Sequence, residues 1–196
     1  MRLVLASQSP SRLMLLRQGG VDPVVCPADI DEDALLASLA GEPPARVVTA
    51  LARAKAEVVA ARNLGEVTVG CDSMLLLDGA LQGKPRTVEA TIERWKAQRG
   101  NQAQLLTGHA VHYNGHWVEE TTSTTIRFGD VTDADIEAYA RSGEPLQCAG
   151  AFTLEALGSW FIDSIDGDPT SVIGLSMPLL RRALNSFGLN ASAFWT

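Results

Sequence analysis

The chain has no apolar run approaching the roughly 20 residues that a membrane-spanning helix needs. Its first residues also lack the basic segment, long apolar segment and small-residue cleavage site of a secretory signal peptide. These absences lead us to expect a cytoplasmic protein that does not act at a membrane.

Cysteine is scarce, with Cys26, Cys71 and Cys148 as the three positions. They are odd in number, far apart in sequence, and include no C-x-x-C pair. This pattern argues against a disulfide framework or a structural zinc site and favours reduced thiols in the cytosol. His109, His112 and His116 do not form a zinc motif either, because the first two point to opposite faces of a strand and the third lies beyond a turn.

Basic runs are also missing, and the formal net charge is −7. Without a Lys/Arg stripe, binding along a nucleic-acid polymer is excluded as a main function. A nucleotide remains an acceptable substrate, because a few local cations and a metal ion can outweigh an acidic surface. Neither G-x-x-x-x-G-K-[ST] nor G-x-G-x-x-G occurs, which argues against a P-loop and against a dinucleotide-binding fold.

What is present is the composition of a globular protein, with 46% hydrophobic and 20% charged residues among 196. Helical and strand-like segments alternate, which predicts an α/β fold. We treat residues 1–196 as a single domain, with two lobes and a groove between them. Helices are expected at residues 10–18, 45–62, 87–99, 132–141 and 176–187. A short strand is expected from Leu3 up to the first helix, and further strands at 67–71, 74–77, 104–113, 116–128 and 160–162. Asp78-Gly79 and Asn114-Gly115 predict hairpin turns.

The first strand leads directly into the first helix. Ser9 is a good N-cap, and Pro10 suits the first helical position, where a missing N–H has no consequence. A helix N-terminus carries free N–H groups and partial positive charge, and Arg12 adds a full charge there, so the segment suits a phosphate. The alternative is an ordinary strand–helix connection with a surface arginine.

Further candidates follow other apolar segments. Asp72 is expected at the carboxyl end of a strand, where open α/β sheets hold ligands, although it could simply form a turn with Ser73. Lys84 comes after a hairpin and next to a stiffening proline. Glu32 belongs to an acidic group that could bind a metal or only complement a helix dipole. Lys55, in an Ala-rich helix, is either a solvated surface residue or a ligand contact.

Several short segments, taken in order, resemble the Maf-like nucleoside triphosphate pyrophosphatases. They are residues 5–12, 30–32, 51–55, 70–73, 83–85, 107–108, 149–152 and 172–175. The resemblance implies a Maf/ITPase-like α/β fold, with a central mixed sheet flanked by helices and two lobes with a cleft between them. It also implies a cytoplasmic enzyme, often a homodimer, that cleaves a nucleoside triphosphate to the monophosphate and pyrophosphate with Mg²⁺ or Mn²⁺, as housecleaning of unwanted nucleotides.

The resemblance assigns roles position by position. Asp72 matches the catalytic carboxylate, acting either as proton acceptor or as metal ligand, and Glu32 matches an acidic residue near the metal. Arg12, Lys55 and Lys84 match cations that contact the phosphates. The remaining substrate-binding positions are Ser7, Ser9, Ser11, Ser73 and Glu155. These roles suit the chemistry, because charge builds on phosphate oxygens as water attacks and pyrophosphate leaves.

Departures from the common pattern bear on the base. Pyrimidine-cleaving members typically have Arg where this chain has Ser11 and Thr where it has Ser73. They also have Asp-Lys where it has Gln147-Cys148, and Gln where it has Glu155. The run at residues 146–150 and Glu155 look more like the subgroup that cleaves 7-methyl-GTP, although that subgroup usually has Trp at Ser11. A carboxylate only accepts hydrogen bonds and so suits the N1–H and amino group of guanine. The alternatives are a dTTP or UTP pyrophosphatase, a catalytically silent nucleotide-binding regulator, and an α/β phosphatase that releases orthophosphate.

Overall fold

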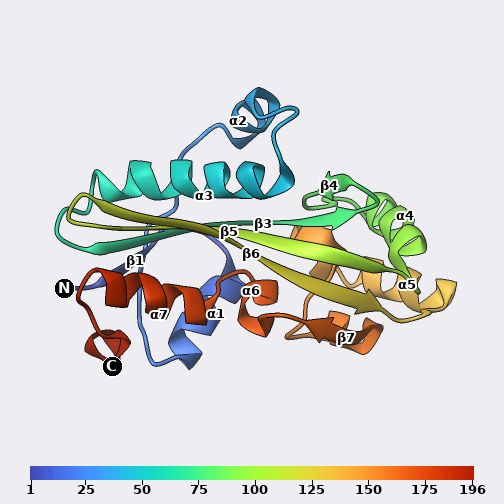
Figure 1. The fold of residues 1–196 in the computed structure, drawn as a ribbon. Helices are drawn as coiled ribbons and strands as arrows, with labels where there is room; N and C mark the ends of the chain where they lie inside the picture. The colour runs from blue at the N-terminus through green and yellow to red at the C-terminus, as the bar shows by residue number, and fades with distance from the viewer. The chain divides into compact units, whose positions relative to one another are not determined.

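The computed structural model describes all 196 residues, and its strands form one seven-stranded mixed sheet (Figure 1). The strands are β1 (Leu3–Leu5), β2 (Val24–Val25), β3 (Val67–Leu77), β4 (Ala80–Gln82), β5 (Gln102–Tyr113), β6 (His116–Phe128) and β7 (Ile162–Asp166). Their order is β2-β1-β3-β5-β6-β7, and β4 pairs with β3. β1 is parallel to β2 and β3, whereas the β3–β4 and β6–β7 pairs are antiparallel. The α/β prediction with a mixed sheet is confirmed.

The helices flank this sheet. They are α1 (Pro10–Gln18), α2 (Glu32–Ser38), α3 (Pro44–Ala60), α4 (Val88–Gln98), α5 (Asp133–Arg141), α6 (Pro169–Ile173) and α7 (Met177–Ser186), with short 3₁₀ helices η1 (Glu144–Gln147), η2 (Ala149–Ala151), η3 (Leu157–Phe161) and η4 (Ala191–Phe194). Ser9, Thr87, Thr132 and Ser176 are N-caps whose side chains accept a hydrogen bond from the first turn. The predicted starts of these helices are confirmed.

Both predicted hairpin turns are present. Asn114 and Gly115 have φ of 48° and 83°, and Asp78 and Gly79 have φ of 48° and 79°. Two consecutive left-handed residues match the right-handed twist of the flanking strands, and Asn, Asp and Gly tolerate this conformation best. The turns therefore connect β5 to β6 and β3 to β4 directly.

The prediction that Asp72 ends a strand is wrong. β3 runs without interruption from Val67 to Leu77, so Asp72 and Ser73 lie in its middle and are half-buried. The strand continues because the apolar residues after Ser73 pair with β4, with Leu75 opposite Gln82. The short strand β1, however, pairs with β3 only as far as Val69, so Asp72 lies beyond the carboxyl end of β1.

The expected buried strand at residues 160–162 is also wrong in part. Trp160 lies in η3 with 84% of its surface exposed, and the strand β7 begins only at Ile162. An apolar triplet was too short a signal to separate a strand from a surface turn, because the neighbouring elements decide which side chains are covered.

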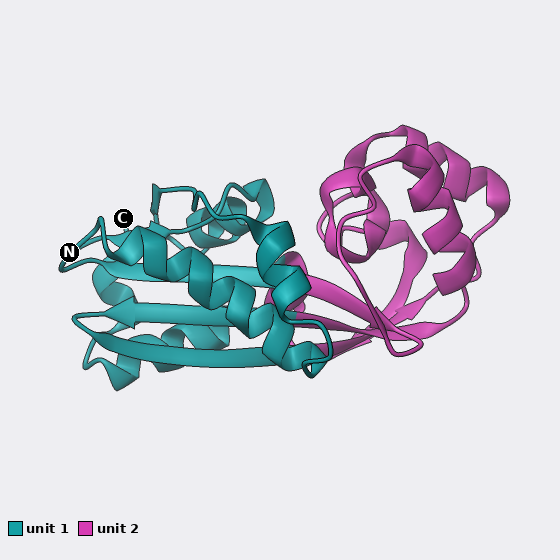
Figure 2. Cartoon of the chain, turned by 90° about the horizontal axis from the view of Figure 1, so that it is seen from above, with its two compact units in different colours: residues 1–72, 107–122, 174–196 teal, residues 73–106, 123–173 magenta.

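The chain divides into two compact units (Figure 2). Unit 1 comprises residues 1–72, 107–122 and 174–196, and unit 2 comprises residues 73–106 and 123–173. Strands β3, β5 and β6 contribute residues to both units. The division matches the expected two lobes; the cleft between them and the single-domain assignment stay predictions.

In unit 1, α3 covers one face of the sheet, and α1 and α7 cover the other (Figure 1). α3 lies unusually close to the strands, because glycines face it. A Cβ on Gly70 would come within 2.4 Å of the Ala52 carbonyl oxygen, and one on Gly108 within 2.3 Å of the Val48 carbonyl. Only glycine at these two positions allows the helix backbone to approach this far.

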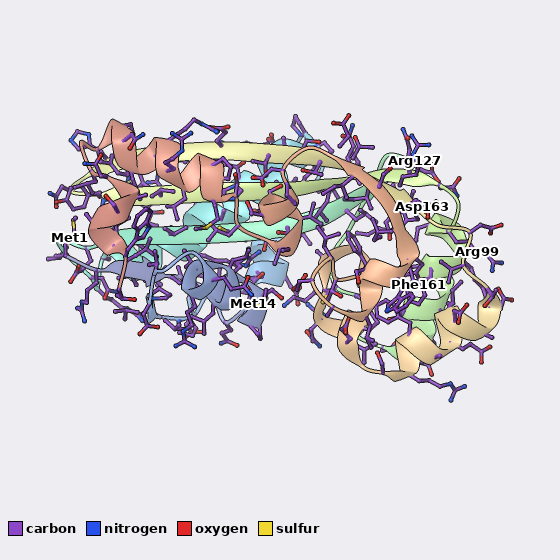
Figure 3. The ribbon with its side chains drawn as sticks, turned by 90° about the horizontal axis from the view of Figure 1, so that it is seen from below. Met1, Met14, Arg99, Arg127, Phe161 and Asp163 are labelled. Carbon is purple, nitrogen blue, oxygen red and sulfur yellow. The ribbon has the colours of Figure 1, made fainter.

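Unit 2 has its own apolar core around Trp95, which is fully buried. The indole contacts Phe128, Tyr139 and Phe161 edge-on, with ring centroids 5.5, 5.9 and 5.6 Å away. Figure 3 marks Phe161, which connects η3 to β7. The indole N–H donates to the Ala151 carbonyl at 2.7 Å, so the buried polar atom has a partner.

No helix of the structure has the length and apolar character required to span a membrane. Cys26, Cys71 and Cys148 are free thiols.

Candidate active site

The N-terminus of α1 fixes Arg12 from two sides. Ser9 caps the helix by accepting from the Arg12 backbone N–H at 3.4 Å. Ser7 accepts from Arg12 Nη1 at 3.0 Å and from the Ser9 backbone N–H at 3.1 Å. Arg12 Nε donates to the Gly174 carbonyl at 2.8 Å. The guanidinium therefore has a set orientation rather than the freedom of a surface arginine.

Gly174 is needed for this arrangement. Its φ is +124°, a conformation that side chains rarely adopt, and a Cβ there would come 3.0 Å from Arg12 Nε. Gly174 lies within residues 172–175, one of the segments that resembles the family, and the structure supplies the physical reason for a glycine at this point.

Lys55, Asp72 and Glu32 form a second group in unit 1. Lys55 Nζ lies 2.7 Å from Asp72 Oδ1 and 2.8 Å from Glu32 Oε2. The side chains of Lys55 and Asp72 are only 11% and 14% exposed, whereas that of Glu32 is 53% exposed. One ammonium group thus joins two carboxylates at a site that opens to solvent on the Glu32 side.

The position of Lys55 follows from the helix that carries it. The buried face of α3 includes Val48, Leu51, Ala52, Lys55 and Val59. This is the i, i+3, i+4 spacing of one helical face, so Lys55 points at the sheet and is not a solvated surface residue. The close approach of α3 at Gly70 brings the helix over β3 just before Asp72.

Two neighbouring acidic residues at the start of α2 make different contacts. Asp31 caps the helix by accepting from the Ala34 backbone N–H at 2.9 Å. Glu32, the first residue of α2, instead reaches Lys55. Helix capping and the ion-pair contact are therefore both present, on neighbouring residues.

Burial raises the pKa of the Cys71 thiol to about 11, and the charges of Arg12, Asp72 and Lys55 also act on it. Arg12 and Lys55 lower this pKa, whereas Asp72 raises it. Arg12, Lys55 and Asp72 therefore all lie close enough to Cys71 for their charges to act on its thiol.

Unit 2 holds the other predicted positions. Lys84 is exposed, but the backbone around it is fixed on both sides. The Gly83 carbonyl accepts from Arg94 Nη1, and the Arg86 N–H donates to the Leu146 carbonyl at 2.9 Å. Only the side chain of Lys84 has freedom to meet a ligand.

Glu155 is half-buried, and its Oε2 accepts from the Leu154 backbone N–H at 3.1 Å. Cys148 lies near it. The pKa of the Cys148 thiol is raised to about 11, mainly by burial and also by the charges of Glu155 and Glu144, whereas the charge of Lys84 lowers it. Lys84 and Glu155, both in unit 2, therefore lie close enough to Cys148 for their charges to act on its thiol.

The remaining predicted residues are Ser11, half-buried in the first turn of α1, and Ser73, half-buried in β3. Ser11 belongs to unit 1 and Ser73 to unit 2. Convergence of Arg12, Asp72 and Lys84 on one ligand remains a prediction.

The donor set of unit 1 suits a hard divalent cation. The Glu32 and Asp72 carboxylates already share one cation, the Lys55 ammonium. No group of three or more His, Cys, Asp or Glu residues is arranged to hold a metal ion. Magnesium commonly binds through one or two carboxylates, with waters and substrate phosphates as its other ligands. Glu32 and Asp72 fit that pattern.

Sequence reasoning missed Glu144. Its carboxylate accepts from Tyr139 Oη at 3.1 Å and from the Thr153 hydroxyl. The available signal was the run Gly143-Glu144-Pro145. In the structure, Gly143 is left-handed with φ of 81° and Pro145 is buried. A charged residue between two such positions has a fixed backbone.

These features define a class: an α/β protein in which a strand carboxylate, a buried lysine and an arginine at a helix N-terminus gather in one unit. Residues 2–187 match the model of the family described as Maf-like protein, so the chain belongs to that family. A protein named nucleoside triphosphate pyrophosphatase from Corynebacterium efficiens is 67% identical over 196 residues, covering 100% of both chains. Proteins of the same name from Corynebacterium diphtheriae and Rhodococcus opacus are 65% and 52% identical, covering 100% and 98% of this chain and 98% and 95% of theirs.

Proposed function

We propose that this chain is a nucleoside triphosphate pyrophosphatase that hydrolyses its substrate to a nucleoside monophosphate and pyrophosphate. The observation that carries the proposal is the contact of Lys55 with both Asp72 and Glu32, in a member of a family whose relatives bear that name. The site belongs to a cytoplasmic enzyme, active as a homodimer, that clears non-standard nucleotides.

The residues of unit 1 have complementary tasks in this reaction. Arg12, oriented by Ser7 and Gly174, binds phosphate oxygens and stabilises the charge that grows as pyrophosphate leaves. The N–H groups at the start of α1 contribute partial positive charge, and Ser9 and Ser11 lie at the same helix end. Lys55 binds phosphate in exchange for part of its contact with the carboxylates.

Asp72 orients or deprotonates the attacking water, or holds the metal together with Glu32. A bound Mg²⁺ or Mn²⁺ neutralises phosphate charge and lowers the pKa of a coordinated water. In unit 2, we assign phosphate binding to Lys84 and Ser73. Lys84 suits this task because its backbone is fixed while its ammonium group is exposed.

The base is guanine or 7-methylguanine. Glu155 carries this part of the proposal, because a carboxylate accepts from the adjacent N1–H and amino group of guanine and offers no donor to a pyrimidine. Glu155→Gln should therefore shift kcat/KM towards UTP and dTTP. An unchanged preference across a panel of GTP, 7-methyl-GTP, UTP, dTTP, ATP and CTP would reject the assignment.

Product identification tests the reaction itself. Purified protein with Mg²⁺ or Mn²⁺ should release pyrophosphate and monophosphate, not orthophosphate. Asp72→Asn should lower kcat at least about 100-fold, the usual contribution of a positioned acid–base group. Asp22→Asn is the matched control, because Asp22 is exposed and pairs only with Arg17 at 3.0 Å. Orthophosphate as the product, no turnover, or equal activity of the two variants would reject the proposal.

A further inference from the structure

Glu144 opens η1 and gathers hydrogen bonds from both ends of a short loop. At the first end it accepts from the Thr153 hydroxyl. At the second end its Oε2 accepts from the Leu157 N–H at 3.2 Å and its Oε1 from the Gly158 N–H at 3.1 Å. Glu155 lies between these anchors.

The loop has further ties at its base. The Gly158 N–H also donates to Thr153 Oγ1 at 3.2 Å, which closes the loop on itself. Tyr139 Oη accepts from the Thr153 N–H at 3.2 Å and donates to Glu144 at 3.1 Å. Tyr139 itself is buried against Trp95, so the network rests on the core of unit 2.

Space at the closure is fully used. A Cβ on Gly158 would come within 2.4 Å of the Thr153 carbonyl oxygen and 2.6 Å of Tyr139 Oη. Thr153 and Gly158 are both buried. The loop can therefore take this shape only while its two ends stay together, and Glu144 is the side chain that holds them.

The charge state of Glu144 agrees with this role. Burial opposes its ionisation, but the hydrogen bonds from Thr153, Gly158 and Leu157 outweigh burial and lower the pKa of the carboxyl group. An ionised carboxylate accepts from all of these donors at once, because it has two oxygens and no proton of its own.

We infer that Glu144 is a positioning residue for base selection: it clamps residues 153–158 so that Glu155 meets the base in one orientation. This inference rests on the proposed function and names the device behind its specificity. Glu144 acts through Glu155 and takes no part in phosphate cleavage. Its loss should therefore weaken base preference more than turnover of a poor substrate.

Two variants break the clamp in different ways. Glu144→Gln keeps the shape but turns an N–H₂ group towards donors of the loop, and Thr153→Val removes one hydroxyl donor. Thr153→Ser keeps that hydroxyl and serves as the conservative rescue. Glu137→Gln is the matched charge control. Glu137 is exposed on α5, and its ion pair with Arg141 is long, at 3.9 Å.

The first readout is the ratio of kcat/KM for GTP to that for UTP. Glu144→Gln and Thr153→Val should each lose about tenfold of whichever preference the wild type shows, the effect expected of one lost oriented hydrogen bond. The second readout is hydrogen exchange at the Leu157 and Gly158 amides, which should be about tenfold faster in both variants. Thr153→Ser and Glu137→Gln should match the wild type in both.

Several outcomes would overturn the clamp. An equal loss of activity on GTP and UTP would assign Glu144 a purely structural role. Unchanged amide exchange would show that Glu144 does not hold the loop, and faster exchange with an intact base ratio would separate the loop from base choice. The exchange measurement needs no turnover. A wild type that releases no pyrophosphate would therefore defeat the proposed function, and the clamp would still be decided by exchange.

Discussion

Asp72 in unit 1 and Glu144 in unit 2 are both partly buried carboxylates, but their partners differ in kind. Asp72 is paired with a single ammonium group, that of Lys55, which also contacts Glu32. Glu144 accepts from two hydroxyls, of Tyr139 and Thr153, and from two backbone N–H groups. Asp72 faces a charged side chain, whereas Glu144 faces neutral hydroxyl and backbone dipoles.

The difference matches two tasks. A lysine ammonium is a point charge on a flexible stem, so its contact with Asp72 can be exchanged for phosphate or a metal ion during a reaction. Backbone N–H groups cannot leave without unfolding their loop, so Glu144 stays where it is. The same functional group therefore serves as a changeable site in one unit and as a permanent support in the other.

Breaking the first region should have the largest effect. Gly70→Ala would place a Cβ within 2.4 Å of the Ala52 carbonyl oxygen, so α3 would have to move away from β3 and carry Lys55 with it. We expect a loss of about 1–3 kcal/mol in the free energy of unfolding, measured in urea. Activity should fall as well, because Lys55 would no longer meet Asp72.

Gly83→Ala is the control for stability. A Cβ there meets only Met74 Cε at 3.7 Å, an ordinary contact, and the φ of Gly83 is not left-handed. If Gly70→Ala unfolded at the same urea concentration as Gly83→Ala, close packing of α3 would not be what positions Lys55.

The contribution of Glu144 in unit 2 to the free energy of unfolding should depend on pH. The pKa of Glu144 is lower in the folded protein than its ordinary value of about 4.5, so its ionised form adds stability that is complete above that value and lost as pH falls through the folded pKa. The stability difference between wild type and Glu144→Gln should be constant from about pH 8 to about pH 6 and shrink below about pH 4. A difference that grew on acidification would contradict the lowered pKa.

The smallest effect concerns the two cysteines that report on these regions. Burial raises the pKa of both Cys71 and Cys148 to about 11, so alkylation in the native state at about pH 8 should be slow. The rate of labelling of half-buried Cys148, measured by mass spectrometry, should rise about tenfold for each pH unit up to about pH 10. Glu144→Gln should modestly accelerate Cys148, because one charge that raises its pKa is gone, and should leave Cys71 unchanged. Rapid labelling of Cys71 in the folded protein would show that its surroundings are open.

Local signals predicted much of the fold. The caps at Ser9, Thr87 and Thr132 and the Asn114-Gly115 turn are confirmed, because capping and turn geometry depend on a few neighbouring residues. The end of a strand at Asp72 was wrong, because pairing with β4 continues the strand past a polar residue. The prediction of a buried strand at Trp160 was wrong for a related reason, because burial depends on elements distant in sequence.

The sequence by itself determined the α/β class, the family and the candidate residues Arg12, Lys55 and Asp72, because composition, periodicity and short ordered motifs are properties of the chain alone. Tertiary structure decided that Lys55 is buried against Asp72 and Glu32, and that Glu144 fastens the loop bearing Glu155. The reason is physical: an ion pair or a loop clamp needs atoms from separate segments within about 3 Å. Only close packing, such as α3 against Gly70, creates that proximity.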